Sequence, residues 1–156
     1  MAISIGPNTF ARMTVKIINH SSNPLPVYET KGAAGMDLRA NLNAPVTLGS
    51  LERAFIPTGL YIELPEGYEA QVRPRSGLAL KQGLTCLNSP GTVDSDYRGE
   101  IKIILVNLSK EAQVVSPGDR IAQMVFQRVE RATLVPADEI SVTERGVGGF
   151  GHTGHR

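Results

Sequence analysis

The chain has 156 residues, of which 41% are hydrophobic and 20% are charged, and its 16 Lys and Arg nearly balance its 15 Asp and Glu. These values are ordinary for one globular domain, and they exclude a fully disordered chain and a bulk electrostatic binder of nucleic acid or membranes. The single cysteine, Cys86, excludes an intrachain disulfide and a thiolate metal site, and it fits a reducing compartment.

The longest apolar run, 103–106, is far shorter than the roughly 20 residues of a membrane span. Residues 1–12 lack the basic patch and apolar stretch of a secretory signal. The sequence therefore predicts a cytoplasmic protein with no membrane and no nucleic acid among its partners.

Short segments of alternating apolar and polar residues recur along the chain, as in half-buried strands. They cover residues 14–18, 60–64, 69–73, 101–107, 113–116 and 121–129. The fourth and sixth are the richest in apolar residues, which predicts that they are central strands. One short helix is predicted over 76–82, with Ser76 as its N-cap and Gly83 as its end. This pattern predicts an all-β barrel or sandwich.

The last residues, 144–156, contain five glycines and few side chains to bury, which predicts a mobile arm. Within it, 146–151 matches G-x-G-x-x-G, but the chain ends before the helix and acidic residue that a dinucleotide site needs. Glycine amides and Arg145 suit phosphates, and Phe150 suits a nucleobase. The alternative is a tail without function.

Residues 73–81 place Arg73 and Arg75 before the predicted helix, where free amides and the helix dipole favour an anion. Ser76 can cap that helix or bind a phosphate oxygen. No P-loop sequence is present. The alternative is a capped helix with a solvated basic flank.

Residues 91–99 predict a tight hairpin that carries Asp94 and Asp96 on one side of an extended segment. Either carboxylate can hold a water molecule as a general base, and Tyr97 offers a flat surface to a sugar. The alternative is that both aspartates only form the turn. Two further segments, 34–40 with Asp37 and 118–123 with Gln123, are weak indications by themselves.

Taken in order, these segments resemble the five motifs of the homotrimeric dUTP pyrophosphatases. The motifs stand here at 34–40, 74–81, 91–99, 118–123 and 145–154. The resemblance implies a jelly-roll-like β-barrel of the dUTPase-like β-clip type over residues 1–143, with residues 1–12 flexible and 144–156 closing over an active site. It also implies a homotrimer with shared sites that hydrolyses dUTP to dUMP and pyrophosphate with Mg²⁺. This activity supplies dUMP for thymidylate synthesis and keeps uracil out of DNA.

The resemblance also assigns a role to each matching residue. Asp94 activates the water that attacks the α-phosphorus, and Tyr97 lies against the deoxyribose. Asp37 acts on the metal indirectly, through water, because Mg²⁺ is held mainly by the triphosphate. The other substrate-binding residues that the resemblance implies are Asn88, Thr92, Val93 and Lys102 at the base pocket, Arg75, Ser76, Gly77 and Gln123 at the phosphates, and Arg145, Phe150, Gly151 and Thr153 in the arm. His152 stands where the family often has Ser, so its contact with substrate stays open.

Two alternative functions are also compatible with this sequence. A dCTP deaminase shares the trimeric β fold, but it needs an acid/base group beside the pyrimidine C4, usually Glu, whereas here Asp94 is followed by Ser95, Asp96 and Tyr97. A nucleotide-binding protein without turnover needs no residue that activates water. Ammonia release from dCTP would favour the first alternative, and nucleotide affinity without pyrophosphate release would favour the second.

Overall fold

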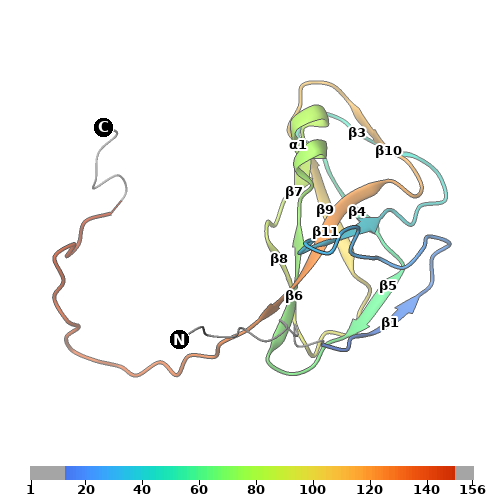
Figure 1. Ribbon diagram of the computed structural model, residues 1–156. Coiled ribbons are helices and arrows are strands. Elements are labelled where there is room, and N and C mark those ends of the chain that lie inside the picture. Colours follow the sequence, from blue (N-terminus) through green and yellow to red (C-terminus); the bar gives the residue numbers. More distant parts are fainter. Residues whose placement is uncertain (1–12, 150–156) are drawn as a thin grey trace, which may run out of the picture.

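The computed structural model describes residues 13–149, which form eleven short strands and one helix. The strands are β1 (Lys16–Asn19), β2 (Met36–Arg39), β3 (Val46–Leu48), β4 (Arg53–Pro57), β5 (Leu60–Glu63), β6 (Tyr68–Arg73), β7 (Leu84–Cys86), β8 (Gly91–Val93), β9 (Lys102–Asn107), β10 (Gln113–Val115) and β11 (Arg120–Arg128). The helix α1 (Ser76–Gln82) lies at one end of the body, between β6 and β7 (Figure 1). The predicted all-β class with one short helix is confirmed.

Every strand pairing is antiparallel, in two larger sheets and two ribbons of two strands. The larger sheets have the orders β2-β11-β6-β8 and β4-β9-β7, and the ribbons pair β1 with β5 and β3 with β10. Strands β9 and β11 each lie between two neighbours, so both predicted central strands are confirmed. Strands β3, β4 and β7 were not predicted.

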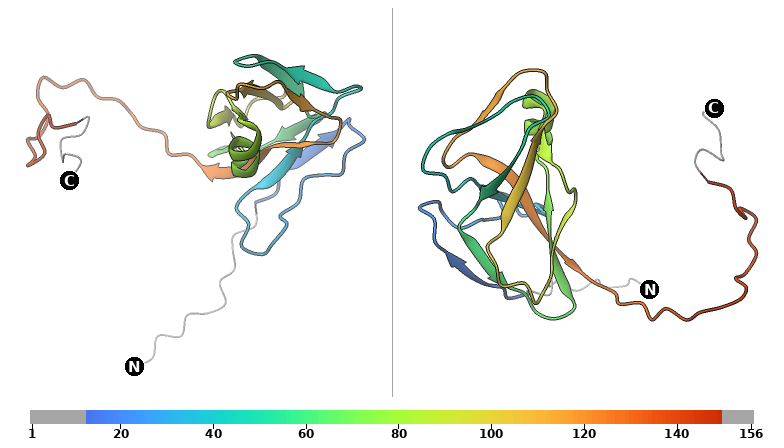
Figure 2. Two further views of the ribbon diagram at one scale, coloured as in Figure 1. Left: turned by 90° about the horizontal axis from the view of Figure 1, so that it is seen from above. Right: turned by 180° about the vertical axis from the view of Figure 1, so that it is seen from behind.

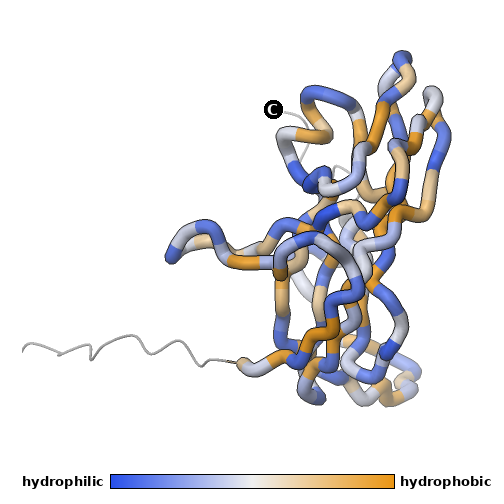
Figure 3. Tube along the Cα trace, turned by 90° about the vertical axis from the view of Figure 1, so that its right-hand side faces the viewer, coloured by the Kyte–Doolittle hydropathy of each residue, from blue (hydrophilic) through white to orange (hydrophobic). Residues whose placement is uncertain are grey.

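The core is a single aliphatic cluster that joins strands from all of the sheets. On β6, Ala70 and Val72 are buried, whereas the alternate residues Glu69, Gln71 and Arg73 are half-buried and polar. The same alternation of hydrophobic and hydrophilic residues is visible along much of the trace (Figure 3). The polar face of the four-stranded sheet is therefore its outer face, and it carries much of the candidate site.

A fully buried side chain, Asn107, ties the end of β9 to the turn after β3. Its Nδ2 donates to the carbonyl oxygens of Leu48, Gly49 and Glu111 at 2.8–3.1 Å. Its Oδ1 accepts from the amide and the hydroxyl of Ser109 at 2.9 and 2.7 Å. All the hydrogen-bonding capacity of this buried amide is thus used within the loops that it joins.

The predicted bounds and end of α1 are confirmed, but its predicted N-cap is wrong. Gly83 ends the helix in the left-handed region at φ 66°, and its amide donates to the carbonyl of Ala79 at 3.0 Å. At the other end, the carbonyl of Arg75 accepts the first helical hydrogen bond, from the amide of Ala79, while Arg75 itself stays extended. Arg75 is therefore the N-cap residue, and the hydroxyl of Ser76 does not cap the helix.

The predicted tight hairpin over 91–99 is also wrong. The chain does turn, since the amide of Tyr97 donates to the carbonyl of Asp94 at 3.2 Å. However, β8 pairs with β6, and within residues 13–149 it does not pair with β9. Both edges of β9 are already taken by β4 and β7, so the segment crosses from one sheet to the other. This crossing leaves a concave space beside Asp94.

After β11 the chain leaves the body and runs as an exposed arm (Figures 1 and 2). Residues 130–147 are exposed throughout, and they include large apolar side chains that no residue between 13 and 149 covers: Leu134, Val135, Ile140, Val142 and Val147. The sequence predicted that the arm starts at residue 144, whereas the exposed segment begins earlier in the structure. Across residues 13–149, no helix is long and apolar enough to cross a membrane.

Candidate active site

Four polar side chains meet where β2, β11 and the loop after β6 come together, and we name Asp37, Arg75, Arg120 and Gln123 the Asp37 cluster. Asp37 Oδ1 lies 2.9 Å from Arg75 Nε, and its Oδ2 lies 3.3 Å from Arg120 Nη1. Arg75 Nη1 also donates to the carbonyl of Arg120 at 3.0 Å. Two guanidinium groups share one carboxylate, so the cluster keeps a net positive charge and suits an anion.

The remaining contacts of the cluster fix the chain just before α1. Gln123 is the β11 partner of both Asp37 and Arg73, and its Nε2 donates to the carbonyl of Pro74 at 2.9 Å. Ser76 and Gly77 follow directly and are exposed. A Cβ on Gly77 would meet no atom within 4 Å, so this surface has room for a ligand to approach the backbone.

A second set of predicted residues lines a concave pocket of about 230 Å³ at the β8 edge of the same sheet, and we name it the Asp94 pocket. The structure brings together here the six residues predicted for the base, the sugar and the attacking water: Asn88, Thr92, Val93, Asp94, Tyr97 and Lys102. The pocket is also lined by four residues that sequence reasoning missed: Phe55, Glu100, Ile101 and Ile104.

The ring of Tyr97 is held against its own loop. Its hydroxyl donates to the carbonyl of Glu100 at 3.0 Å. A Cβ at Gly99 would overlap this ring, so the ring lies where only glycine leaves space. The wall of the pocket that the Tyr97 ring forms is therefore set by two residues of one turn.

Two other contacts hold the rest of the pocket. The carboxylate of Glu100 accepts the amide of Gly59 at 2.8 Å and lies 3.6 Å from Lys102 Nζ. A Cβ at Gly91 would meet Asn88 Nδ2 at 3.0 Å, so glycine lets the carboxamide lie against the strand. Lys102 and Asn88 are thus positioned by partners that are not themselves predicted site residues.

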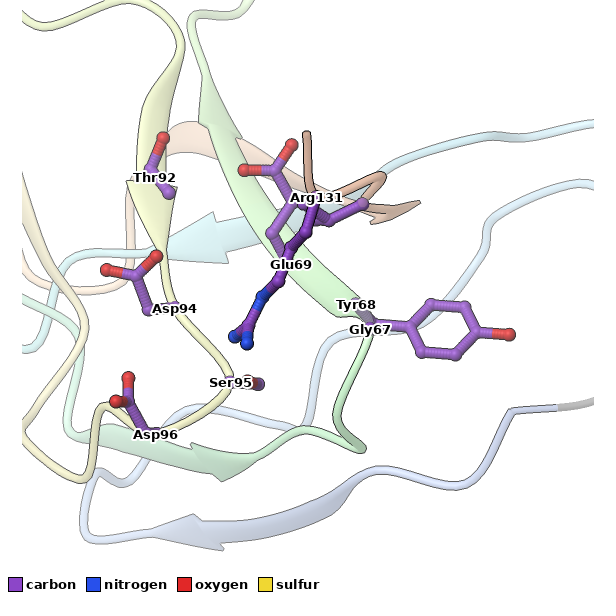
Figure 4. Close-up of a pocket in the computed structure, with 9 residues that line it drawn as sticks. Gly67, Tyr68, Glu69, Thr92, Asp94, Ser95, Asp96 and Arg131 are labelled. Carbon is purple, nitrogen blue, oxygen red and sulfur yellow. The ribbon is translucent and has the colours of Figure 1, made fainter. Parts of the chain in front are cut away.

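Asp94 also borders a larger hollow of about 420 Å³, which Figure 4 shows in close-up. Asp94, Ser95 and Asp96 follow one another along the turn, and Glu69 and Arg131 come from β6 and from the start of the arm. Asp94 and Thr92 line both the Asp94 pocket and this larger hollow. Its carboxylate therefore stands at the edge of the pocket, with open space on either side of its strand.

In one chain, the Asp37 cluster and the Asp94 pocket lie at diagonally opposite corners of the four-stranded sheet. Asp94 follows Val93, the β8 partner of Ala70, so it lies beside the start of β6. Arg75 follows the far end of β6, about six extended residues or about 20 Å away. Its guanidinium points further off, because it binds Asp37 on β2, three strands from β8.

Both groups nevertheless face the same side of the sheet. Asp37, Gln123 and Arg73 are register partners across three strands, and Gln71, two residues from Arg73, is the partner of Thr92. The structure thus presents two half-sites on one outer face without joining them.

Ser76 and Gly77 lie next to the Asp37 cluster, and the four predicted residues of the arm lie outside both groups. Arg145 lies in the arm, where its Nε donates to the carbonyl of Gly148 at 2.8 Å. Phe150, Gly151 and Thr153 lie outside the described residues. The residues that reasoning missed include Arg120, which the motif at 118–123 contained but for which no role was proposed. No sequence pattern indicated that Phe55 belongs to the pocket, because a single aromatic residue on a short strand forms no motif.

The residues from 13 to 149 contain no group of three His, Cys, Asp or Glu side chains arranged to hold a metal ion. In the Asp37 cluster, each carboxylate oxygen of Asp37 already has an arginine partner. This donor set fits a contact with a hydrated metal ion, and it does not fit a cage of protein ligands.

Comparisons with known proteins agree on one family. The sequence profile of the dUTPase family matches residues 21–154. The deoxyuridine 5'-triphosphate nucleotidohydrolase of Fusobacterium nucleatum is 57% identical over 143 residues, which cover 92% of this chain and 98% of that protein. The protein of the same name from Finegoldia magna is also 57% identical over 143 residues and is covered completely.

The solved structures that resemble this chain carry the same description. A dUTPase of Staphylococcus bacteriophage 80alpha, solved with dUpNHpp, gives a TM-score of 0.79 at 26% identity, with 90% of this chain and 98% of that chain covered. A dUTPase of phage phi11 of S. aureus, described with a structural Mg(II) ion, gives a TM-score of 0.71 at 24% identity, with 81% of this chain and 98% of that chain covered.

Proposed function

The chain belongs to the dUTPase family and is a dUTP diphosphatase, and on this premise we propose how its residues hydrolyse dUTP to dUMP and pyrophosphate. A water molecule held by Asp94 attacks the α-phosphorus, and Asp94 takes the proton. The position of Asp94 at the edge of a pocket of nucleoside size supports this role, because a general base must reach the attacking water directly.

In this proposal the Asp94 pocket binds the nucleoside. Asn88 and the backbone at Thr92 and Val93 recognise uracil, and Lys102 lines the same pocket. A site built to hydrogen-bond one base edge rejects the other pyrimidine by leaving polar groups unpaired. The ring of Tyr97, fixed over Gly99, occupies the space that a 2′-hydroxyl would need.

The Asp37 cluster binds the phosphates. Arg75 and Gln123 are already oriented by Asp37 and by the carbonyl of Pro74, and Ser76 and Gly77 lie beside them on an open surface. Preorganised charge of this kind stabilises negative charge that develops during phosphoanhydride cleavage. Asp37 would contact a hydrated Mg²⁺ that the triphosphate brings with it, and that ion would supply further neutralisation of the phosphate charge.

The separation of the two half-sites supports sites that are shared between copies, and the resemblance to the homotrimeric dUTP pyrophosphatases supports three copies. Asp94 and Arg75 of one chain are too far apart to act on one triphosphate, so each site combines the Asp94 pocket of one copy with the Asp37 cluster of another. The arm, with its uncovered apolar side chains, reaches a neighbouring copy, and Arg145, Phe150, Gly151 and Thr153 close over the substrate. Closure of this kind excludes water from the reacting phosphates.

The first test is pyrophosphate release in the presence of Mg²⁺ from dUTP, dTTP, dCTP and UTP. Strong preference for dUTP supports the base pocket and the sugar filter together. Asp94→Asn should still bind dUTP but lose most of its turnover, because the amide cannot accept the proton of the water. Undiminished turnover would remove Asp94 from this role, and ammonia release from dCTP would indicate a deaminase.

The second test uses complementation between two inactive variants. Arg75→Ala lacks a working phosphate half, and Asp94→Asn lacks a working base. When the two are unfolded together and refolded, sites that combine Asp94 of one variant with Arg75 of the other are intact, about a quarter of all sites if copies mix at random. Recovered dUTP hydrolysis supports sites shared between copies, and none in a proven mixed oligomer would refute it.

A further inference from the structure

Helix α1 exposes a large apolar side chain on the same face as a proposed phosphate-binding residue. Leu80 is 87% exposed, whereas Leu78 packs against the core. Ser76 and Leu80 are four residues apart, so they lie on one face of the helix, about 6 Å apart along its axis. A molecule that meets Ser76 therefore also meets Leu80.

An apolar row crosses the outer face of the three-stranded sheet beside the Asp94 pocket, and we name Phe55, Ile104 and Leu87 the Phe55 row. Phe55 on β4 is the register partner of Ile104 on β9, and the amide of Leu87 donates to the carbonyl of Ile104 at 2.9 Å. The side chain of Phe55 is 65% exposed although it forms part of the pocket wall together with Ile104. Phe55 and Leu87 are exposed on either side of the half-buried Ile104, on β4 and just after β7, and neighbouring apolar groups of this kind are typical of a contact surface.

We propose that the Phe55 row of one copy receives Leu80 of a second copy, and that this contact joins the two half-sites. The inference rests on the proposed shared site, in which Ser76 of the second copy approaches the nucleotide in the Asp94 pocket of the first. Leu80 is then within about one helical turn of the pocket rim, and the apolar surface at that rim is the Phe55 row.

The charges around the two surfaces are complementary. The Asp37 cluster, just before α1, has one positive charge in excess, and Lys81 adds another beside Leu80. On the other surface, the charge of Lys102 is offset by Glu100, which leaves the carboxylate of Asp94 at the pocket. The adjoining hollow is lined by Glu69, Asp94 and Asp96 against the single cation Arg131, so it is negative as well. Opposite charges that flank an apolar contact steer the two copies into one register.

Cross-linking between two differently tagged chains tests the contact. One chain carries Phe55→Cys and the other carries Leu80→Cys, and the mixed oligomer is oxidised with diamide. The native Cys86 is buried, so it does not compete for the reagent. The matched control replaces Leu80→Cys with Leu51→Cys, because Leu51 is also an exposed leucine and lies on the turn after β3.

A disulfide-linked heterodimer that forms with Leu80→Cys, and at least tenfold less with Leu51→Cys, supports the proposal. Equal yields for both, or no link in an oligomer that the complementation test shows to share its sites, would overturn it while leaving the shared site intact. A link between Phe55→Cys and Leu134→Cys in place of Leu80→Cys would also overturn it, because the arm would then cover the row. Failure of the complementation test would refute the proposed function instead.

Discussion

The substitution Gly99→Ala tests whether the position of Tyr97 sets the choice between deoxyribose and ribose. The added Cβ overlaps the Tyr97 ring, so either the ring turns away or the turn shifts. In either case the hydrogen bond from its hydroxyl to the carbonyl of Glu100 is strained or lost. The backbone of Gly99 itself does not need a left-handed conformation, so the effect comes from the ring and not from strain at residue 99.

The expected magnitude follows from what the ring does. The hydrogen bond that fixes it contributes about 1 kcal/mol, which is too little to unfold the domain. A well-shaped apolar wall rejects an added hydroxyl by about 100-fold, so losing this wall should reduce the preference for dUTP over UTP by up to about that factor. The kcat/KM for dUTP should fall less, because the smaller sugar still fits.

Steady-state kcat/KM values for dUTP and UTP measure this directly in the wild type, in Gly99→Ala and in two reference variants. Tyr97→Phe keeps the ring without its hydroxyl and should retain most of the discrimination. Gly32→Ala is the matched control, because a Cβ there also lacks backbone strain and meets no atom within 4 Å. If Gly99→Ala discriminates as strongly as Gly32→Ala, the ring of Tyr97 is not the sugar filter.

Three further predictions concern stability, measured by denaturant unfolding at one fixed protein concentration. Leu51→Gly should raise the free energy of unfolding by about 1 kcal/mol. Leu51 is 73% exposed and is held at φ 62°, a conformation that disfavours residues with a Cβ. A lower free energy of unfolding would show that the Leu51 side chain is buried in the oligomer. Asn107→Ala should lower the free energy of unfolding by at least about 3 kcal/mol, since three carbonyl groups lose their donor; a change below 1 kcal/mol would contradict the network. Burial raises the pKa of the Cys86 thiol from 9.0 to about 11, so with rising pH the thiol of the unfolded chain loses its proton first. The free energy of unfolding should therefore fall between pH 9 and 11. If the free energies of unfolding of the wild type and of Cys86→Ser differ by the same amount across this window, this prediction is wrong.

Strand length explains only part of which strands could be predicted from the sequence, because the three-residue β10 was predicted and the five-residue β4 was not. β6, β9 and β11 have six to nine residues, so the pattern of buried and exposed positions repeats several times. β3 and β7 have three residues each, which is barely one full period. The pairing of β8 could not be read either, because it depends on competition between distant strands for the edges of β9.

The candidate site likewise contains residues that could be predicted from the sequence and residues that could not. Asn88 lies just before the motif at 91–99, which contains Asp94 and Tyr97, and the structure brings these three residues into one pocket. Phe55 joins the same pocket from a strand more than 30 residues earlier, and only the register of β4 against β9 places it there. Residues that complete a site through sheet register carry no local signal.

Because Arg75 and not Ser76 is the N-cap of α1, both side chains can take part in the proposed phosphate binding. A serine that caps its own helix spends its hydroxyl oxygen on a backbone amide, whereas here the backbone of Arg75 takes the cap position and the hydroxyl of Ser76 does not bind the helix. Arg75 is extended at that point, which allows its side chain to turn back to Asp37 while Ser76 starts the helix on the open side. In the proposed site, this one backbone bend would direct the guanidinium and the hydroxyl to two different parts of the triphosphate, and a residue that favours a helical conformation at position 75 would disturb that arrangement.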